Sequence, residues 1–152
     1  MILRTVSLLL TGLAIVACDM GGGSSSQSSD PGPYQLTFSL DESFQAPHGN
    51  QPIRIALVRL TDGLVLEEAF GTVSAVNDPT FNFSPATMLE RGTSYAVHYW
   101  IDSNIGGGTL GLCDPTDFDH QWSTEFFTPT NDINFTVGYE PTLTEYVCDT
   151  FP

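Results

Sequence analysis

The sequence contains no lysine, and its four basic side chains are all arginines. Against them stand 18 acidic residues, so the formal net charge of the 152-residue chain is −14. A protein that binds nucleic acid needs a basic face for the phosphates, and we therefore expect no nucleic-acid partner. Calcium or cationic partners suit this charge better.

The sequence also lacks an apolar run long enough to span a bilayer, which takes about 20 residues. The apolar run at its start covers residues 6–17, behind a single early positive charge at Arg4. A short run in this position is typical of a secretory signal peptide. We therefore expect residues 1–17 to direct export of the chain.

Sequence motifs of common catalytic sites are missing too. No phosphate-binding loop, dinucleotide-binding glycine motif or metalloprotease helix motif occurs. The stretch 92–96, with the sequence GTSYA, matches a nucleophile elbow only faintly. That elbow needs a strand before its serine and a helix after it, whereas this sequence predicts the reverse order. We therefore interpret the protein as non-catalytic.

The end of the apolar run, AIVAC at residues 14–18, resembles the lipobox of bacterial lipoproteins. The resemblance implies cleavage before Cys18 and a diacylglyceryl group on its sulfur. Two or three buried acyl chains anchor a protein firmly, at roughly 0.8 kcal/mol per CH₂. Residues 18–33 are rich in Gly and Ser and are expected to form a flexible tether. These features predict a lipid-anchored protein of the bacterial cell envelope, with the membrane as its first partner.

Cysteine is scarce, with three in the chain. Once Cys18 carries the lipid, Cys113 and Cys148 remain, and two cysteines in an exported protein are expected to pair. Their bridge would stabilise the fold by about 4 kcal/mol in the chain-entropy model. Neither of them has the closely spaced second cysteine that is typical of a zinc site.

From residue 34 onward the sequence predicts an all-β domain. Short stretches of alternating apolar and polar residues are separated by Gly, Pro, Asn and Asp, which indicates a single antiparallel β-sandwich over residues 34–152. A bulge or bend is expected near Gly71. One short helix is expected over residues 84–92, with Ser84 as its N-cap and Gly92 just past its end. The expected strands are 34–40, 52–60, 64–76, 80–84, 94–101, 121–129 and 133–139.

The stretch LERGTSYAV at residues 89–97 resembles the corner before a late strand in fibronectin type III and related immunoglobulin-like domains. Transthyretin-like sandwiches use similar corners. The resemblance implies that the hydroxyl of Tyr95 bonds to the backbone. It also places the loop between residues 99 and 122 at one end of the sandwich. The matching residues are Leu89, Gly92, Thr93, Tyr95 and Val97, whereas Arg91 stands where proline is usual.

That loop holds acidic side chains with no cation between them. Oxygen ligands two residues apart, followed by a glycine turn, suit calcium. Gly106 and Cys113 occupy positions at which an EF-hand has oxygen ligands, so the loop is no EF-hand. The other interpretation is that these side chains cap turns or are solvated, and both remain open. The candidate ligands of a structural calcium ion are Asp102, Asn104, Asp114, Asp117 and Asp119.

Histidine and tryptophan add further candidates. His120 is either a transition-metal ligand or a hydrogen-bonding loop residue, His98 is expected to be structural, and His48 is expected to be exposed. Trp100 and Trp122 flank the acidic loop. If exposed, they could stack on sugar rings; otherwise they belong to the core.

Together these features predict a non-catalytic envelope lipoprotein that serves as a binding or structural accessory module. Its partner would be another envelope protein or a glycan. The acidic loop is expected to be its distinctive end, whether or not calcium stabilises it. The alternative is a carbohydrate-binding module that uses Trp100 and Trp122.

Overall fold

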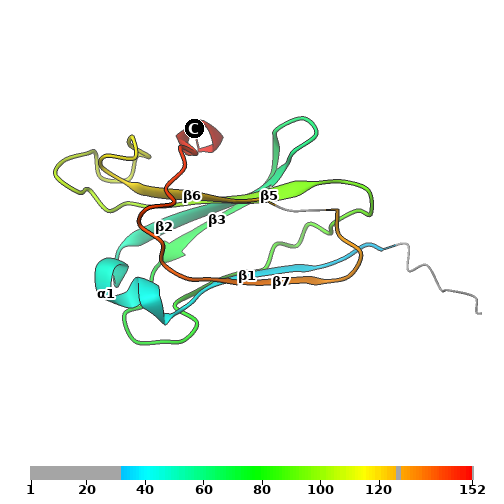
Figure 1. The fold of residues 1–152 in the computed structure, drawn as a ribbon, viewed down its shortest axis with the longest axis horizontal. Coiled ribbons are helices and arrows are strands. Elements are labelled where there is room, and N and C mark those ends of the chain that lie inside the picture. The colour runs from blue at the N-terminus through cyan, green and yellow to red at the C-terminus, as the bar shows by residue number, and fades with distance from the viewer. Residues whose placement is uncertain (1–31, 126–127, 152) are drawn as a thin grey trace, which may run out of the picture.

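The computed structural model describes residues 32–125 and 128–151, which form two β-sheets packed face to face (Figure 1). The predicted sandwich is thereby confirmed. The sheets have the strand orders β4-β1-β7 and β3-β2-β5-β6. The predicted signal peptide, Cys18 and most of the predicted tether lie outside the described residues. The strands are β1 Leu36–Leu40, β2 Pro52–Arg59, β3 Leu64–Thr72, β4 Phe81–Phe83, β5 Tyr95–Ile101, β6 His120–Glu125 and β7 Ile133–Val137.

One strand pair differs from the antiparallel prediction, because β7 runs parallel to β1. The chain reaches β7 from β6, which belongs to the other sheet, so no tight hairpin fixes its direction. Two hydrogen bonds fix its start instead. The Gln35 N–H donates to the carboxylate of Asp132 at 2.9 Å, and the Ile133 N–H donates to Gln35 O at 2.8 Å. The remaining strand pairs among the described residues are antiparallel.

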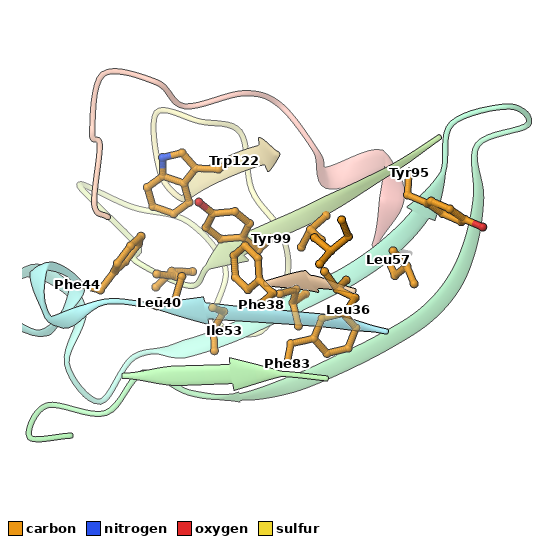
Figure 2. Close-up of a cluster of buried hydrophobic side chains, with 14 of the residues drawn as sticks. Leu36, Phe38, Leu40, Phe44, Ile53, Leu57, Phe83, Tyr95, Tyr99 and Trp122 are labelled. Atoms are coloured by element: carbon orange, nitrogen blue, oxygen red, sulfur yellow. The ribbon is translucent and has the colours of Figure 1, made fainter. Parts of the chain in front are cut away.

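The core lies between the sheets and is built from the alternate residues that face inward. Phe38 of β1 packs on Tyr99 of β5, with ring centroids 5.1 Å apart (Figure 2). Tyr99 in turn stacks on Trp122 of β6 at 5.2 Å. Ile53 and Leu57 of β2 are no more than 1% exposed. Each such side chain contributes about 1.5–3 kcal/mol by its burial, so this layer holds the two sheets together.

The predicted helix at residues 84–92 is wrong. The Glu67 carboxylate of β3 accepts the N–H groups of Ala86 and Thr87 at 3.0 and 2.9 Å, and Leu89 pairs with Tyr34 in an isolated antiparallel bridge. In the predicted helix the Leu89 N–H would donate to the Pro85 carbonyl, whereas here it donates to Tyr34 O at 2.7 Å, so the bridge replaces a helical hydrogen bond. The α-helix of the described chain is α1, Gln45–His48, which follows the 3₁₀ turn η1, Glu42–Phe44.

The bulge in β3 also lies elsewhere than predicted. The register between β2 and β3 shifts at Leu57 and Val58, opposite Glu67 and Val65, whereas Gly71 pairs regularly with Ile53. Gly71 has a packing role instead. A Cβ atom there would lie 2.7 Å from the ring of Phe81, so a larger residue would force that ring to move.

Two other predictions are confirmed. The hydroxyl of Tyr95 accepts a hydrogen bond from the Glu90 N–H at 2.9 Å, which fixes the corner before β5. Cys113 and Cys148 form a disulfide with their Cα atoms 5.3 Å apart. A disulfide of this kind indicates that the protein folds outside the cytoplasm. The helices of the described chain are too short, or too polar, to cross a membrane.

Candidate functional site

The β5–β6 loop, residues 102–119, is organised around one buried carboxylate. The side chain of Asp119 is fully buried. Its Oδ1 accepts the N–H groups of Ser103 and Asn104 at 2.9 and 3.1 Å, and its Oδ2 accepts the Asp114 N–H at 3.0 Å. Burial raises the pKa of Asp119, and these three hydrogen bonds act against that increase. One side chain thereby fixes both ends of the loop.

Two more carboxylates hold the middle of the loop. Asp102 is 3% exposed, and its oxygens accept the side-chain amide of Asn104 and, at 2.7 Å, the Gly111 N–H. Asp114 accepts the N–H of Thr109. Gly108 lies so close to these groups that a Cβ atom there would be 2.8 Å from the Asn104 side-chain oxygen. The glycine is therefore required by this close approach.

The five candidate calcium ligands thus lie in one loop, but most of them already have other bonding partners. Asp102, Asp114 and Asp119 accept backbone N–H groups, while Asp117 is exposed. Within the described part of the chain, no three His, Cys, Asp or Glu side chains are grouped so as to hold a metal ion. These hydrogen bonds match the turn-capping interpretation, and a calcium titration is the test of the alternative.

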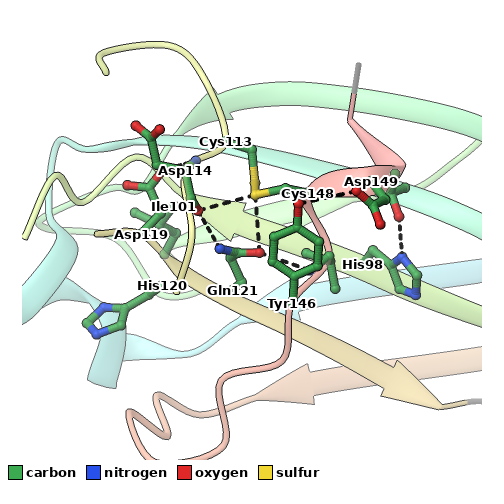
Figure 3. The surroundings of a disulfide bond; sticks show 12 residues. His98, Ile101, Cys113, Asp114, Asp119, His120, Gln121, Tyr146, Cys148 and Asp149 are labelled. Atoms are coloured by element: carbon green, nitrogen blue, oxygen red, sulfur yellow. Dashed lines mark hydrogen bonds between the residues drawn. A yellow bond between two sulfur atoms is a disulfide. The ribbon is translucent and has the colours of Figure 1, made fainter. Parts of the chain in front are cut away.

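Gln121 of β6 connects the loop to the C-terminal segment, a link that the sequence analysis missed. This side chain is fully buried; its Nε2 donates to Asp114 O at 2.6 Å and its Oε1 accepts the Val147 N–H at 2.9 Å (Figure 3). The Cys113–Cys148 bridge joins the same two segments. Loop and C-terminus are therefore held together by a covalent bond and by a buried amide.

The outer part of the loop carries exposed apolar side chains. Ile105 is 47% exposed, Leu110 80% and Leu112 60%. Exposed apolar side chains mark an interaction site where they border a common surface, and of these three Leu110 lines a cleft. The hydrogen bonds and the disulfide described above keep the loop ordered without the burial of these side chains.

A cleft of about 370 Å³ lies between this loop and the outer face of the four-stranded sheet; we call it the loop–sheet cleft. Phe70 and Leu110, 84% and 80% exposed, line its rim, and Arg54, Trp100 and Asp102 also line it. Phe70, Arg54 and Trp100 are neighbours in one row across β3, β2 and β5. The register of the sheet therefore brings these three residues together.

The charge of Arg54 has no counter-ion within the described chain. The ion pair formed there joins Arg59 to Asp62, with Nη2 and Oδ2 2.7 Å apart, and Arg91 donates to the Tyr34 hydroxyl at 3.3 Å. Arg54 is half-buried beside Trp100. The indole N–H of Trp100 is likewise buried without a hydrogen-bond partner among the described residues. Among the residues that line the cleft, Arg54 thus carries a charge that the described fold does not pair.

The histidines differ from the predictions at one position. His48 is 2% exposed and not a surface residue, because α1 turns it inward. Its Nδ1 lies 2.6 Å from Gln51 Oε1, and its Nε2 lies 3.0 Å from Nδ1 of His120. Burial lowers the pKa of both histidines. His98 is structural as expected, with its Nδ1 2.6 Å from the hydroxyl of Thr150.

The two tryptophans do not offer exposed platforms. Trp100 and Trp122 are 2% and 4% exposed, and the Trp122 Nε1 donates to Glu140 O at 3.1 Å. A second hollow of about 540 Å³ lies beside β6, but Trp122 forms only part of its lining. Stacking of a sugar ring needs an open aromatic face, which these two residues do not provide.

Comparison of the chain with protein-family models, with curated proteins and with solved structures finds no match.

Proposed function

We propose that this chain is an exported, lipid-anchored and non-catalytic binding module whose binding site is the loop–sheet cleft. The observation that carries the proposal is the exposed apolar rim of Phe70 and Leu110 around that cleft. Exposed side chains of this size at a concave site favour a ligand that covers them. The lipid on Cys18 would hold the module at the envelope.

The hydrogen bonds that fix the rim of the cleft favour a binding role over a purely structural one. Leu110 lies between Thr109 and Gly111, whose N–H groups are bonded to Asp114 and Asp102. A rim fixed in this way loses little conformational freedom when a ligand binds, which favours affinity. The charged side chains that line the cleft are Arg54 and Asp102, and the oxygens of Asp102 already accept hydrogen bonds.

Photo-crosslinking in intact cells tests the proposed site. A photoreactive phenylalanine analogue would replace Leu110 or Phe70, and a matched variant would carry it at Leu60. Leu60 is 45% exposed and follows β2 at the other end of the sheet. We expect adducts from the two cleft positions and not from position 60. Equal adduct yields at all three positions would overturn the cleft as the binding site.

The anchor has a separate test. Cys18→Ser removes the thiol that would carry the lipid, so we expect the variant to leave the detergent phase and the wild type to remain in it. A conservative change at the neighbouring residue, Met20→Leu, is the control. If the serine variant partitions like the wild type, the lipid-anchored part of the proposal fails.

A further inference from the structure

We propose that the loop–sheet cleft binds a small amphiphilic carboxylate, with its apolar body between Phe70 and Leu110 and its carboxylate paired with Arg54. This inference rests on the proposed function and gives the cleft a ligand class. Arg54, Phe70 and Leu110 come from β2, β3 and the β5–β6 loop, and all three line the same cleft.

The unpaired guanidinium of Arg54 indicates that the polar group of the ligand is an anion. Arg54 presents a planar fork of donors that matches the two oxygens of a carboxylate. Partial burial beside Trp100 removes part of its hydration, and no carboxylate of the described chain forms an ion pair with it. An anionic group on the ligand would supply the missing partner.

The lining and the volume of the cleft indicate that the rest of the ligand is apolar and small. Around Arg54, the cleft is lined largely by apolar side chains, with Phe70 and Leu110 the most exposed of them. Its volume of about 370 Å³ lies at the lower end of the range for small-molecule sites. A medium-length alkyl chain or a single ring fits this size, whereas a highly hydroxylated molecule would leave polar groups against an apolar rim.

Two features of the charge distribution bear on a carboxylate. Asp102 also lines the cleft, but its oxygens accept hydrogen bonds from Gly111 and Asn104, so it is less available to a ligand cation than Arg54 is to an anion. The net charge of −14 opposes anions at a distance. Physiological salt screens exposed charges beyond about 8 Å, so the charges that line the cleft outweigh the distant ones.

Calorimetry on the full mature chain tests the inference, using an exported Cys18→Ser form so that no detergent competes for the cleft. The probes are octanoate, octanol and octylammonium, which share one chain and differ in the headgroup. We expect octanoate to bind at least ten-fold more tightly than octanol. Arg54→Gln should remove that preference, whereas Arg59→Gln, at the opposite end of β2, should keep it. Unchanged melting curves would show that the variants fold.

Other outcomes separate the ligand class from the site. If octanol and octanoate bind equally and Leu110→Ser weakens both, the carboxylate class is overturned while the cleft remains a binding site. Tighter binding of octylammonium would overturn the role of Arg54 in favour of Asp102. If no probe binds, the inference fails, and crosslinking at position 110 still decides the proposed function independently.

Discussion

The two ends of the four-stranded sheet are built in different ways. At one end, the β2–β3 turn spans residues 60–63 and is held by an exposed ion pair between Arg59 and Asp62. At the other end, beside α1, the long β5–β6 loop is held by buried carboxylates and a disulfide (Figure 1). Apart from one backbone hydrogen bond from the Leu60 N–H to Ser94 O, the short turn is stabilised by contacts within six residues. The long loop depends on β6 and on the C-terminal segment.

The two ends therefore differ in how many buried interactions keep them ordered. A short turn needs little beyond suitable turn residues. Here Gly63, with its φ of 68°, adopts the left-handed conformation that the turn requires. The loop, in contrast, buries Asp119 and Gln121 completely. Buried polar groups of this kind are costly unless every bond is made. Such an arrangement keeps the exposed rim at Leu110 in place, and the following predictions test the contrast between the two ends.

The largest effect is expected from the disulfide. Replacing Cys113 and Cys148 together by alanine releases a loop whose ends are 35 residues apart in sequence. We expect a loss of about 4 kcal/mol in the free energy of unfolding, because the unfolded chain gains freedom. Urea denaturation measures it. The loss should come with faster proteolysis in the β5–β6 loop and not in the β2–β3 turn; a double variant as stable as the wild type would contradict it.

The buried carboxylate gives the next largest effect. Asp119→Ala leaves the N–H groups of Ser103, Asn104 and Asp114 without their acceptor. At about 1–3 kcal/mol for each buried group left unpaired, we expect a loss on the order of 3 kcal/mol. The matched change at the other end, Asp62→Ala, removes an exposed ion pair and should cost less than about 1 kcal/mol. Similar losses in both variants would break the contrast between the two ends.

The strands and the disulfide could be predicted from the sequence. Strands leave a local pattern of alternating residues, and the disulfide follows from the chemistry of two cysteines in an exported chain. Alternation places Ile53 and Leu57 on one face of β2, and export favours pairing of Cys113 with Cys148. The helix over 84–92 failed for the opposite reason. Its caps at Ser84 and Gly92 are local signals, whereas the competing bridge joins Leu89 to Tyr34, which is distant in the sequence.

The candidate site was only partly accessible for the same reason. The sequence located the acidic loop and left turn capping and calcium binding open, but it did not reveal which backbone N–H groups Asp102 and Asp119 accept. Phe70, Arg54 and Trp100 meet only through the register of three strands, which periodicity does not fix. His48 was misplaced because a single turn of helix, too short for a periodic signal, buries it.

Acid should weaken the loop end more than the turn end. The His48 Nδ1–H donates to Gln51, so His48 Nε2 is an acceptor, and the Nδ1–H of His120 donates a hydrogen bond to it. Burial lowers both pKa values from about 6.5. The stabilisation that the neutral His48–His120 pair gives the folded state is therefore complete above that pH, and it is lost as the pH falls below it. Losing this hydrogen bond costs on the order of 1 kcal/mol.

Thermal melting from pH 7.5 to 5.0 measures this loss, and His48→Leu should flatten the profile. His98, whose pKa is also lowered by burial, adds to the slope in the same range and remains in the variant. Asp119 acts in the opposite sense at more acidic pH, because its raised pKa favours the folded state once it is protonated. Hydrogen exchange should increase at α1 and β6 before the β2–β3 turn, and a uniform increase would contradict the prediction.

Calcium should have the smallest effect of these perturbations. Asp102, Asp114 and Asp119 direct oxygens at backbone N–H groups, so a calcium ion would have to compete with bonds that already order the loop. We expect the same melting temperature in EDTA and in millimolar calcium, with magnesium at equal ionic strength as the control. A ligand at 100 times its Kd would add about 2.7 kcal/mol to stability, an increase that a melting curve resolves easily. A rise with calcium alone, absent in Asp117→Asn, would show that the exposed carboxylate recruits the ion and that the loop end is ordered by a cation as well as by its own backbone.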